Sequence, residues 1–154
     1  MIRTIYHTAV NTFKYATVNP GLPKVLLMAP TGVAAVNVSG STINTALAIP
    51  REVRGNLTPL SDQKKTLLRL SLSELKLIII DEISMVSNNR LLHIHQRLKE
   101  IFGTSSSKLF ADISTLCVGD FYQLPPIKER PVFCPYSNDL QNLMHPWIVL
   151  KWLN

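Results

Sequence analysis

The sequence predicts an α/β fold, in which helices cover both faces of a parallel β-sheet. Three short apolar runs, each bounded by turn residues, have the composition of strands that are buried on both faces. The stretches between them repeat their apolar residues every three or four positions, which is the spacing of an amphipathic helix. Strands that alternate with helices in this way are typical of an α/β fold.

The N-terminal half is expected to contain two helices and one strand. The first fifteen residues have the helical spacing, with apolar residues at Ile2, Tyr6, Ala9, Val10 and Phe13. The turn residues 19–21 end this pattern, and the apolar run 24–29 is expected to form the first strand. A shorter helix is expected over residues 61–70, with Leu67, Leu68 and Leu70 facing the core.

The middle of the chain is expected to form a strand, a long helix and a third strand. Residues 75–80 are rich in isoleucine, which favours a strand. The helix begins after Ser87, whose hydroxyl can cap it, and ends at Gly103. Its inward stripe, in which His95 is expected to be a packed ring, is Leu91, Ile94, His95, Leu98, Ile101 and Phe102. Residues 113–118 are expected to form the third strand, and no clear pattern follows Pro125.

Composition restricts the class of protein. A hydrophobic content of 46% and a charged content of 17% indicate a packed core rather than a disordered chain. No apolar segment is long enough to span a bilayer and no hydrophobic signal follows Met1, so we expect a soluble intracellular protein without a membrane partner. Cys117 and Cys134 are too few for a disulfide scaffold or a four-cysteine zinc site. Residues 1–54 hold five basic residues and one acidic residue, which is compatible with a phosphate-bearing partner.

Polar or turn-forming residues follow each of the three predicted strands. In open α/β sheets the functional groups gather just beyond the carboxyl ends of the strands. Here those positions are Pro30-Thr31-Gly32, Asp81-Glu82 and Gly119-Asp120. We therefore expect the functional site at this edge of the sheet.

Asp81 and Glu82 are adjacent carboxylates at the end of a buried strand, where their charge is costly unless it is used. One of them can hold a magnesium ion through its water shell. The other can orient or deprotonate a water that attacks a phosphate, as in a Walker B element. The alternative is a solvated acidic turn that caps the helix that follows it in the sequence.

Two further segments carry groups that can recognise phosphate. The amide of Gln123 can donate to a terminal phosphate and accept from a water, and the prolines 125 and 126 stiffen its loop. The small residues and hydroxyls of 29–35 and 40–44 allow close approach of the backbone to a ligand. The alternative for the Gln123 segment is an ordinary loop after a strand. The alternative for 29–35 and 40–44 is tight packing of a helix on a strand.

In this order and spacing, the three motifs resemble those of the Pif1-type DNA helicases, superfamily one enzymes that move 5′ to 3′. Residues 29–35 resemble motif Ia, residues 77–85 (LIIIDEISM) motif II, and residues 118–126 (VGDFYQLPP) motif III. The resemblance covers about residues 2–150 and is strongest to the eukaryotic, Helitron-associated type. It implies an incomplete RecA-like P-loop NTPase domain with a three-layer parallel sheet. Residues 1–154 would be a partial domain 1A, with motifs Ia, II and III present and Walker A and motifs IV to VI absent.

The resemblance also implies roles for single residues. Asp81 would hold Mg²⁺ through water, Glu82 would activate the attacking water, and Gln123 would sense the γ-phosphate of ATP. The nucleotide-sensing group would further include Gly119 and Asp120. The residues that would contact single-stranded DNA are Pro30, Thr31, Gly32, Thr42 and Phe121. Implied for the whole protein are ATP-dependent unwinding of DNA, forked DNA as a partner, a monomeric state, a nuclear location, and roles in repair, recombination and telomere maintenance.

Some features depart from the family pattern. Asn44 stands where relatives usually have histidine, and Asp112 where many have glycine. No Gly-Lys pair occurs, so residues 1–154 contain no P-loop. The strand 113–118 would then be an exposed edge that invites self-association. We expect no ATPase or unwinding activity from this chain alone.

Two other functions remain open on the sequence. One is a non-catalytic remnant that at most binds single-stranded DNA weakly. Salt-dependent binding that is lost when Thr31 and Lys24 are mutated would support this function. The other is an unrelated P-loop kinase or GTPase, which fits Asp81 and Glu82 but not the glutamine-proline loop.

Overall fold

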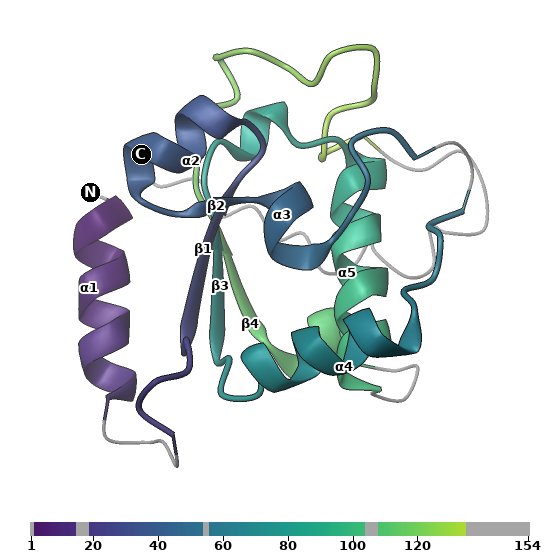
Figure 1. Ribbon diagram of the computed structural model, residues 1–154. Helices are drawn as coiled ribbons and strands as arrows, with labels where there is room; N and C mark the ends of the chain where they lie inside the picture. The colour runs from purple at the N-terminus through teal and green to yellow at the C-terminus, as the bar shows by residue number, and fades with distance from the viewer. Residues whose placement is uncertain (1, 15–18, 54–55, 104–107, 135–154) are drawn as a thin grey trace.

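A four-stranded parallel sheet forms the centre of the molecule (Figure 1). The computed structural model describes residues 2–14, 19–53, 56–103 and 108–134. The strand order is β2-β1-β3-β4, with bounds β1 Val25–Ala29, β2 Ser41–Thr42, β3 Leu77–Ile80 and β4 Ser114–Cys117. The predicted α/β fold and its three strands are therefore confirmed. The strand β2 was not predicted, because two residues are too few to give a strand pattern in the sequence.

The register of the strands brings their carboxyl ends together. Met28 in β1 lies beside Ile80 in β3, and Ile80 lies beside Cys117 in β4. The segments that follow these residues therefore leave the sheet at one edge, and Figure 1 shows them gathered above it. This is the edge at which the sequence predicts the site.

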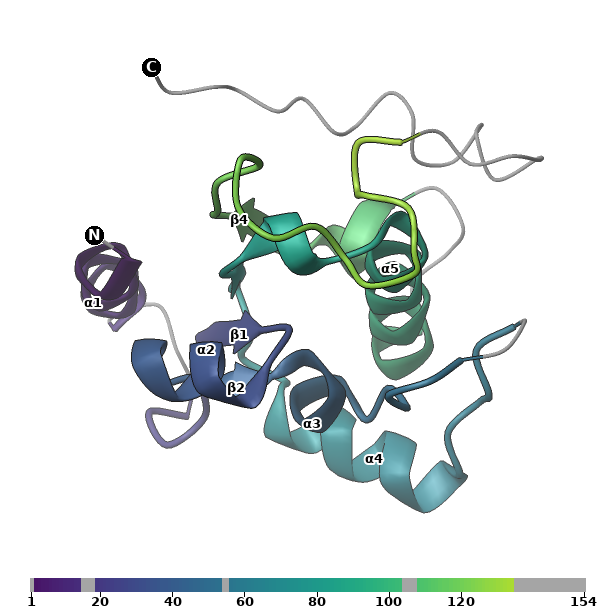
Figure 2. The ribbon, with the colours of Figure 1, turned by 90° about the horizontal axis from the view of Figure 1, so that it is seen from above.

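Helices cover the sheet on both faces, as Figure 2 shows from above with α1 on one side and α5 on the other. The helices α1 (Ile2–Phe13) and α2 (Gly32–Val38) pack against a core of Val25, Leu27, Val38 and Ile79. The opposite face carries the larger core, built with α3 (Ile43–Leu47), α4 (Asp62–Ser71) and α5 (Asn88–Phe102). None of the described helices combines the length and the apolar character needed to cross a membrane.

Helix α5 has the predicted ends and the predicted inward stripe. The Ser87 hydroxyl accepts a hydrogen bond from the Arg90 amide at 3.0 Å, and Gly103 ends the helix with a left-handed φ of 65°. His95 is buried, and its Nδ1 accepts from the amide of Phe110 at 2.9 Å. Burial and the charge of Lys99 lower the pKa of His95. The prediction of a packed ring is confirmed.

Helix α4 begins after Ser61 as predicted, but the predicted inward face is wrong for two of its three leucines. Leu68 packs against the core, whereas Leu67 and Leu70 are 67% and 62% exposed. Successive helical residues are about 100° apart, so residues 67, 68 and 70 cannot all face one side. The core is instead filled by Leu68 and, after the helix, Leu72.

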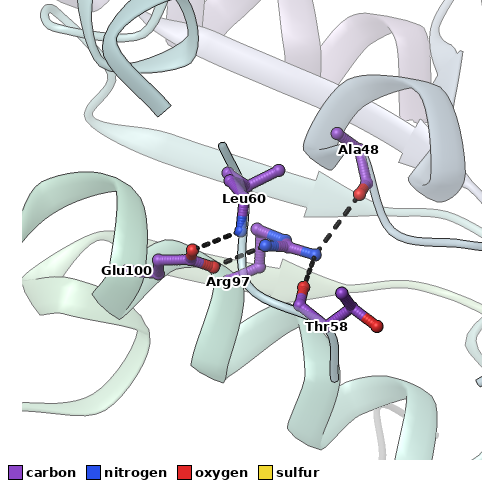
Figure 3. Close-up of polar contacts among 5 residues, drawn as sticks. All are labelled: Ala48, Thr58, Leu60, Arg97 and Glu100. Carbon is purple, nitrogen blue, oxygen red and sulfur yellow. Dashed lines mark hydrogen bonds and ion pairs between the residues drawn. The ribbon is translucent and has the colours of Figure 1, made fainter. Parts of the chain in front are cut away.

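A buried arginine joins α5 to the segment before α4, as Figure 3 shows. Arg97 is only 1% exposed. Its Nη2 donates to the carbonyls of Thr58 at 3.0 Å and Ala48 at 3.4 Å, and its Nη1 pairs with Glu100. Glu100 in turn accepts from the Leu60 amide at 2.6 Å. These contacts hold Ala48, Thr58 and Leu60 against α5.

The turn before β4 explains one departure from the family pattern. It includes the 3₁₀ turn η2 (Leu109–Asp112), in which Phe110, Ala111 and Asp112 all have positive φ. Asp112 has a φ of 67°, a conformation that glycine adopts without steric cost. Within the described ranges β4 pairs only with β3, so its other edge is open, and self-association through that edge stays a prediction.

Candidate functional site

Backbone hydrogen bonds tie the ends of β1, β3 and β4 to one another. The Asp81 amide donates to the Met28 carbonyl at 2.8 Å, and the Val118 amide donates to the Ile80 carbonyl at 2.8 Å. The Ile83 amide then donates back to the Val118 carbonyl at 3.0 Å. The acidic pair and the glutamine loop are thus held in a fixed relation by main-chain contacts.

Glu82 is positioned by its backbone and by its neighbour Gly119. Glu82 is left-handed, with φ 52° and ψ 47°, and directly precedes the 3₁₀ turn η1 (Ile83–Met85). A Cβ added to Gly119 would lie 2.7 Å from the Ile83 nitrogen and 3.3 Å from the Glu82 carbonyl carbon. Only glycine fits there without moving backbone, so Gly119 determines how closely the two motifs approach.

Replacing Gly119 by alanine should therefore destabilise the protein by about 1–3 kcal/mol, because backbone atoms must move to admit the methyl group. Urea unfolding followed by circular dichroism measures the change. Gly21→Ala is the matched control, since its added Cβ would meet only a side-chain atom at 3.4 Å. Equal unfolding free energies for the two variants would contradict the conclusion that only glycine fits at position 119.

Asp120 shapes the turn that presents Gln123. Its Oδ1 accepts from the Tyr122 amide at 2.9 Å, and its carbonyl accepts from the Gln123 amide at 3.0 Å. Both Tyr122 and Gln123 are exposed. Asp120 therefore acts on Gln123 through the conformation of the loop.

Three predicted site residues from three different strand ends line one cavity of about 510 Å³. They are Thr31 after β1, Glu82 after β3 and Gln123 after β4. We call this the Glu82 cavity. The rest of its lining comes from α2, η1 and the glutamine loop: Val33, Ala34, Asn37, Met85, Tyr122 and Leu124. It places a carboxylate, an amide and a hydroxyl around one space, which suits a phosphate and a water.

A second cavity of about 540 Å³ collects four of the five residues predicted to contact DNA. These are Pro30, Thr31, Gly32 and Thr42. We call it the Thr42 groove. Thr31 lines both this groove and the Glu82 cavity, so it lies between the two. The hydroxyls of Thr31 and Thr42 also cap α2 and α3, accepting from the amides of Ala34 and Thr45, each at 3.2 Å.

Two arginines that line the Thr42 groove were not among the site residues predicted from the sequence. Arg90 donates to the carbonyls of Pro50, at 2.8 Å, and Arg51, and burial lowers its pKa. Arg51 is exposed and lines the groove. The basic character of residues 1–54 indicates that Arg51 could contact a phosphate. Nothing in the sequence shows that Arg90 holds the backbone of Arg51.

Other predicted residues lie outside these two cavities. Phe121 lines neither one; it packs against the main core and meets Phe133 edge to face at 5.3 Å. Lys24 is buried at the opposite end of β1 from Thr31 and lines neither cavity. The Asn44 side chain lines the Thr42 groove and donates to the Ile49 carbonyl at 3.1 Å, which closes α3.

Asp81 is half-buried and directly follows β3. It lines neither of the two cavities described above. No group of three or more histidine, cysteine, aspartate or glutamate side chains converges among the residues that the structure describes. A metal ion at this edge would thus take most of its ligands from water and substrate.

Comparison with known proteins assigns the family. Residues 8–136 match the family model of the PIF1-like helicases. The ATP-dependent DNA helicase Pif1 of Psychrobacter sp. is 37% identical over 109 residues, which are 69% of this chain and 16% of that protein. The chain thus spans about a sixth of that relative's length.

Solved structures of Bacteroides Pif1 share the fold. The complex with ADP-AlF4 matches with a TM-score of 0.60 and 29% identity, over 82% of this chain and 27% of that chain. The complex with single-stranded DNA matches with a TM-score of 0.54 and 30% identity, over 79% and 28%. The sequence motifs, the RecA-like sheet and the family model agree, and the chain belongs to the PIF1-like helicase family.

Proposed function

We propose that this chain forms part of the motor of an ATP-dependent DNA helicase that moves 5′ to 3′. The observation that carries the proposal is the Glu82 cavity, in which Thr31, Glu82 and Gln123 meet from three strand ends. The name of the Psychrobacter relative and the ADP-AlF4 complex of the Bacteroides protein support ATP as the substrate. The complex with single-stranded DNA supports the DNA partner.

Glu82 and Gln123 would carry the chemistry at the terminal phosphate of ATP. Phosphoryl transfer needs a positioned nucleophile and neutralised charge more than covalent help from the protein. The Glu82 carboxylate would orient and deprotonate the attacking water. The Gln123 amide would donate to the γ-phosphate, with Gly119 and Asp120 holding its loop.

Asp81 fits a magnesium ion by the nature of its donor. Mg²⁺ in phosphoryl-transfer sites is usually held by one or two carboxylates, with water and phosphate oxygens as the other ligands. The half-buried Asp81 supplies one such hard oxygen ligand beside Glu82. The ion would neutralise the negative charge that develops on the phosphates.

The Thr42 groove would hold the backbone of single-stranded DNA. The hydroxyls of Thr31 and Thr42 and the guanidinium of Arg51 line it, and these groups are typical phosphate ligands. Thr31 lines both spaces, so a change at the γ-phosphate can reach the DNA through a single residue. We infer that this link couples hydrolysis to movement on DNA.

Other properties of the whole protein are inferred from the family resemblance. They are action on forked DNA, a monomeric state, a nuclear location, and service in repair, recombination and telomere maintenance. We further infer that residues 1–154 alone do not hydrolyse ATP, because they contain no Gly-Lys pair and hence no P-loop. A non-catalytic remnant that binds DNA through the Thr42 groove is the second candidate.

Arg51→Ala tests the DNA groove. Each lysine or arginine that neutralises a phosphate contributes about one unit to the slope of log affinity against log salt. We expect the variant to bind single-stranded DNA more weakly and to lose about one unit of that slope. Fluorescence anisotropy with a labelled oligonucleotide over a salt series measures both.

The matched control is Lys76→Ala, since Lys76 is exposed before β3 at the opposite edge of the sheet. It should bind like the parent chain. A salt slope unchanged by Arg51→Ala, or lowered equally by Lys76→Ala, would remove the groove as the DNA site.

A further inference from the structure

A smaller cavity, of about 240 Å³, lies against α5 beside the Thr42 groove. Arg90 and Glu129 line both spaces, so the two are neighbours. The face that α5 turns to the smaller cavity carries Asn89, His93 and Gln96. These positions are four and three residues apart, so the three polar side chains form one stripe on the helix.

His93 is a buried polar ring without a hydrogen bond in the described part of the chain. Its residue exposure is 9%, and it lines the cavity. Burial and the charges of Arg90 and Arg97 lower the pKa of His93, against an opposing effect of Glu129. The ring is therefore neutral at pH 7 and offers one donor and one acceptor.

The charged residues of the cavity disfavour an anionic ligand. Both terminal nitrogens of Arg90 donate to backbone carbonyls, those of Pro50 and Arg51, which leaves fewer of its N–H groups for a ligand. The smaller cavity lacks the exposed Arg51 that lines the Thr42 groove, so among the described residues only Arg90 offsets the negative charge of Glu129 toward a phosphate there. What remains are neutral donors and acceptors over the apolar side chains of Val53 and Leu92. Such a lining suits an uncharged, flat, polar group.

We propose that this cavity takes one nucleobase turned out of the DNA strand that occupies the Thr42 groove. The inference rests on the proposed function, because it needs the strand in that groove. Asparagine and glutamine amides pair with base edges, and unstacked bases of single strands are read through their Watson–Crick edges. At about 30 Å³ per water the space equals about eight waters, room for one base and not for a strand.

A comparison of normal and abasic oligonucleotides tests the inference on the chain as it is. A short single strand and its fully abasic counterpart carry the same phosphates, so the groove alone cannot distinguish them. We expect removal of the bases to weaken binding to the parent chain about tenfold. In Gln96→Ala and in Asn89→Ala, both at exposed positions, this loss should shrink to about twofold.

Gln63→Ala is the matched control, because Gln63 is an exposed glutamine on α4 that lines neither the cavity nor the groove. It should keep the full tenfold difference. The same loss on base removal in the parent chain, Gln96→Ala and Asn89→Ala would overturn the base pocket and leave the groove intact. Absence of salt-dependent binding to any strand would overturn the proposed function, and this inference with it.

Discussion

Glu82→Gln is expected to lower DNA-stimulated ATP hydrolysis by about 10²- to 10⁴-fold in a chimera that carries residues 8–136 in place of the matching segment of Psychrobacter Pif1. The amide keeps the shape of the side chain but cannot take a proton from the attacking water. The left-handed backbone at Glu82 and its contact with Gly119 are unaffected, so the variant should fold. A coupled-enzyme assay with and without single-stranded DNA measures the rates.

Two controls define this result. Glu74→Gln changes a glutamate before β3, at the edge of the sheet opposite the Glu82 cavity, and should hydrolyse ATP like the parent chimera. Residues 1–154 alone should show no hydrolysis. If the Glu82→Gln chimera kept more than a third of the parent rate, Glu82 would have no part in the mechanism. If residues 1–154 alone hydrolysed ATP and Glu82→Gln abolished that activity, the inference that this chain is inactive by itself would be refuted.

Arg97→Met is expected to lower the free energy of unfolding by about 3–5 kcal/mol. The change removes a guanidinium that is 1% exposed and leaves the Glu100 carboxylate without its charged partner. It also leaves the carbonyls of Thr58 and Ala48 without this donor. The Glu100 side chain is only 21% exposed, so an unpaired charge there costs more than the loss of a fully exposed ion pair.

Urea unfolding of the chain measures the effect, with Arg3→Met as control because Arg3 is exposed and makes its contact at the surface. Adding Glu100→Leu to Arg97→Met should recover part of the loss, since it removes the stranded charge. A loss below about 1 kcal/mol in Arg97→Met would show that the network in Figure 3 does not hold Ala48, Thr58 and Leu60 in place.

The strands and the meeting of the candidate site residues at one edge could be predicted because they depend on local pattern. Apolar runs define β1, β3 and β4, and parallel pairing then places Thr31, Glu82 and Gln123 at one edge. The ends of α5 followed from Ser87 and Gly103, which act on the backbone next to them. The cavity that these site residues share is thus a consequence of strand order and register.

The arginines could not be predicted because their partners are distant in sequence. Arg90 donates to carbonyls 39 and 40 residues away, and Arg97 to carbonyls 39 and 49 residues away. On a helix diagram both are ordinary polar positions. The Arg90 contacts place Pro50 and Arg51, and Arg51 forms part of the wall of the Thr42 groove.

The turn at Asp112 was recognised only as a departure from the family. Three consecutive residues with positive φ, Phe110 to Asp112, have no signal in composition when none of them is glycine. Their conformation is instead supported by the His95 acceptor and by the ion pair of Lys108 with Asp112.

In the proposed function, Thr31 and Gln123 link the phosphate of ATP to the DNA strand. The affinity of the chimera for single-stranded DNA, measured with ADP and with ADP-AlF4, tests it most directly. We predict that the two affinities differ about tenfold, and that Gln123→Ala brings them within twofold of each other. Equal affinities in the parent chimera, or an undiminished difference in Gln123→Ala, would contradict the claim.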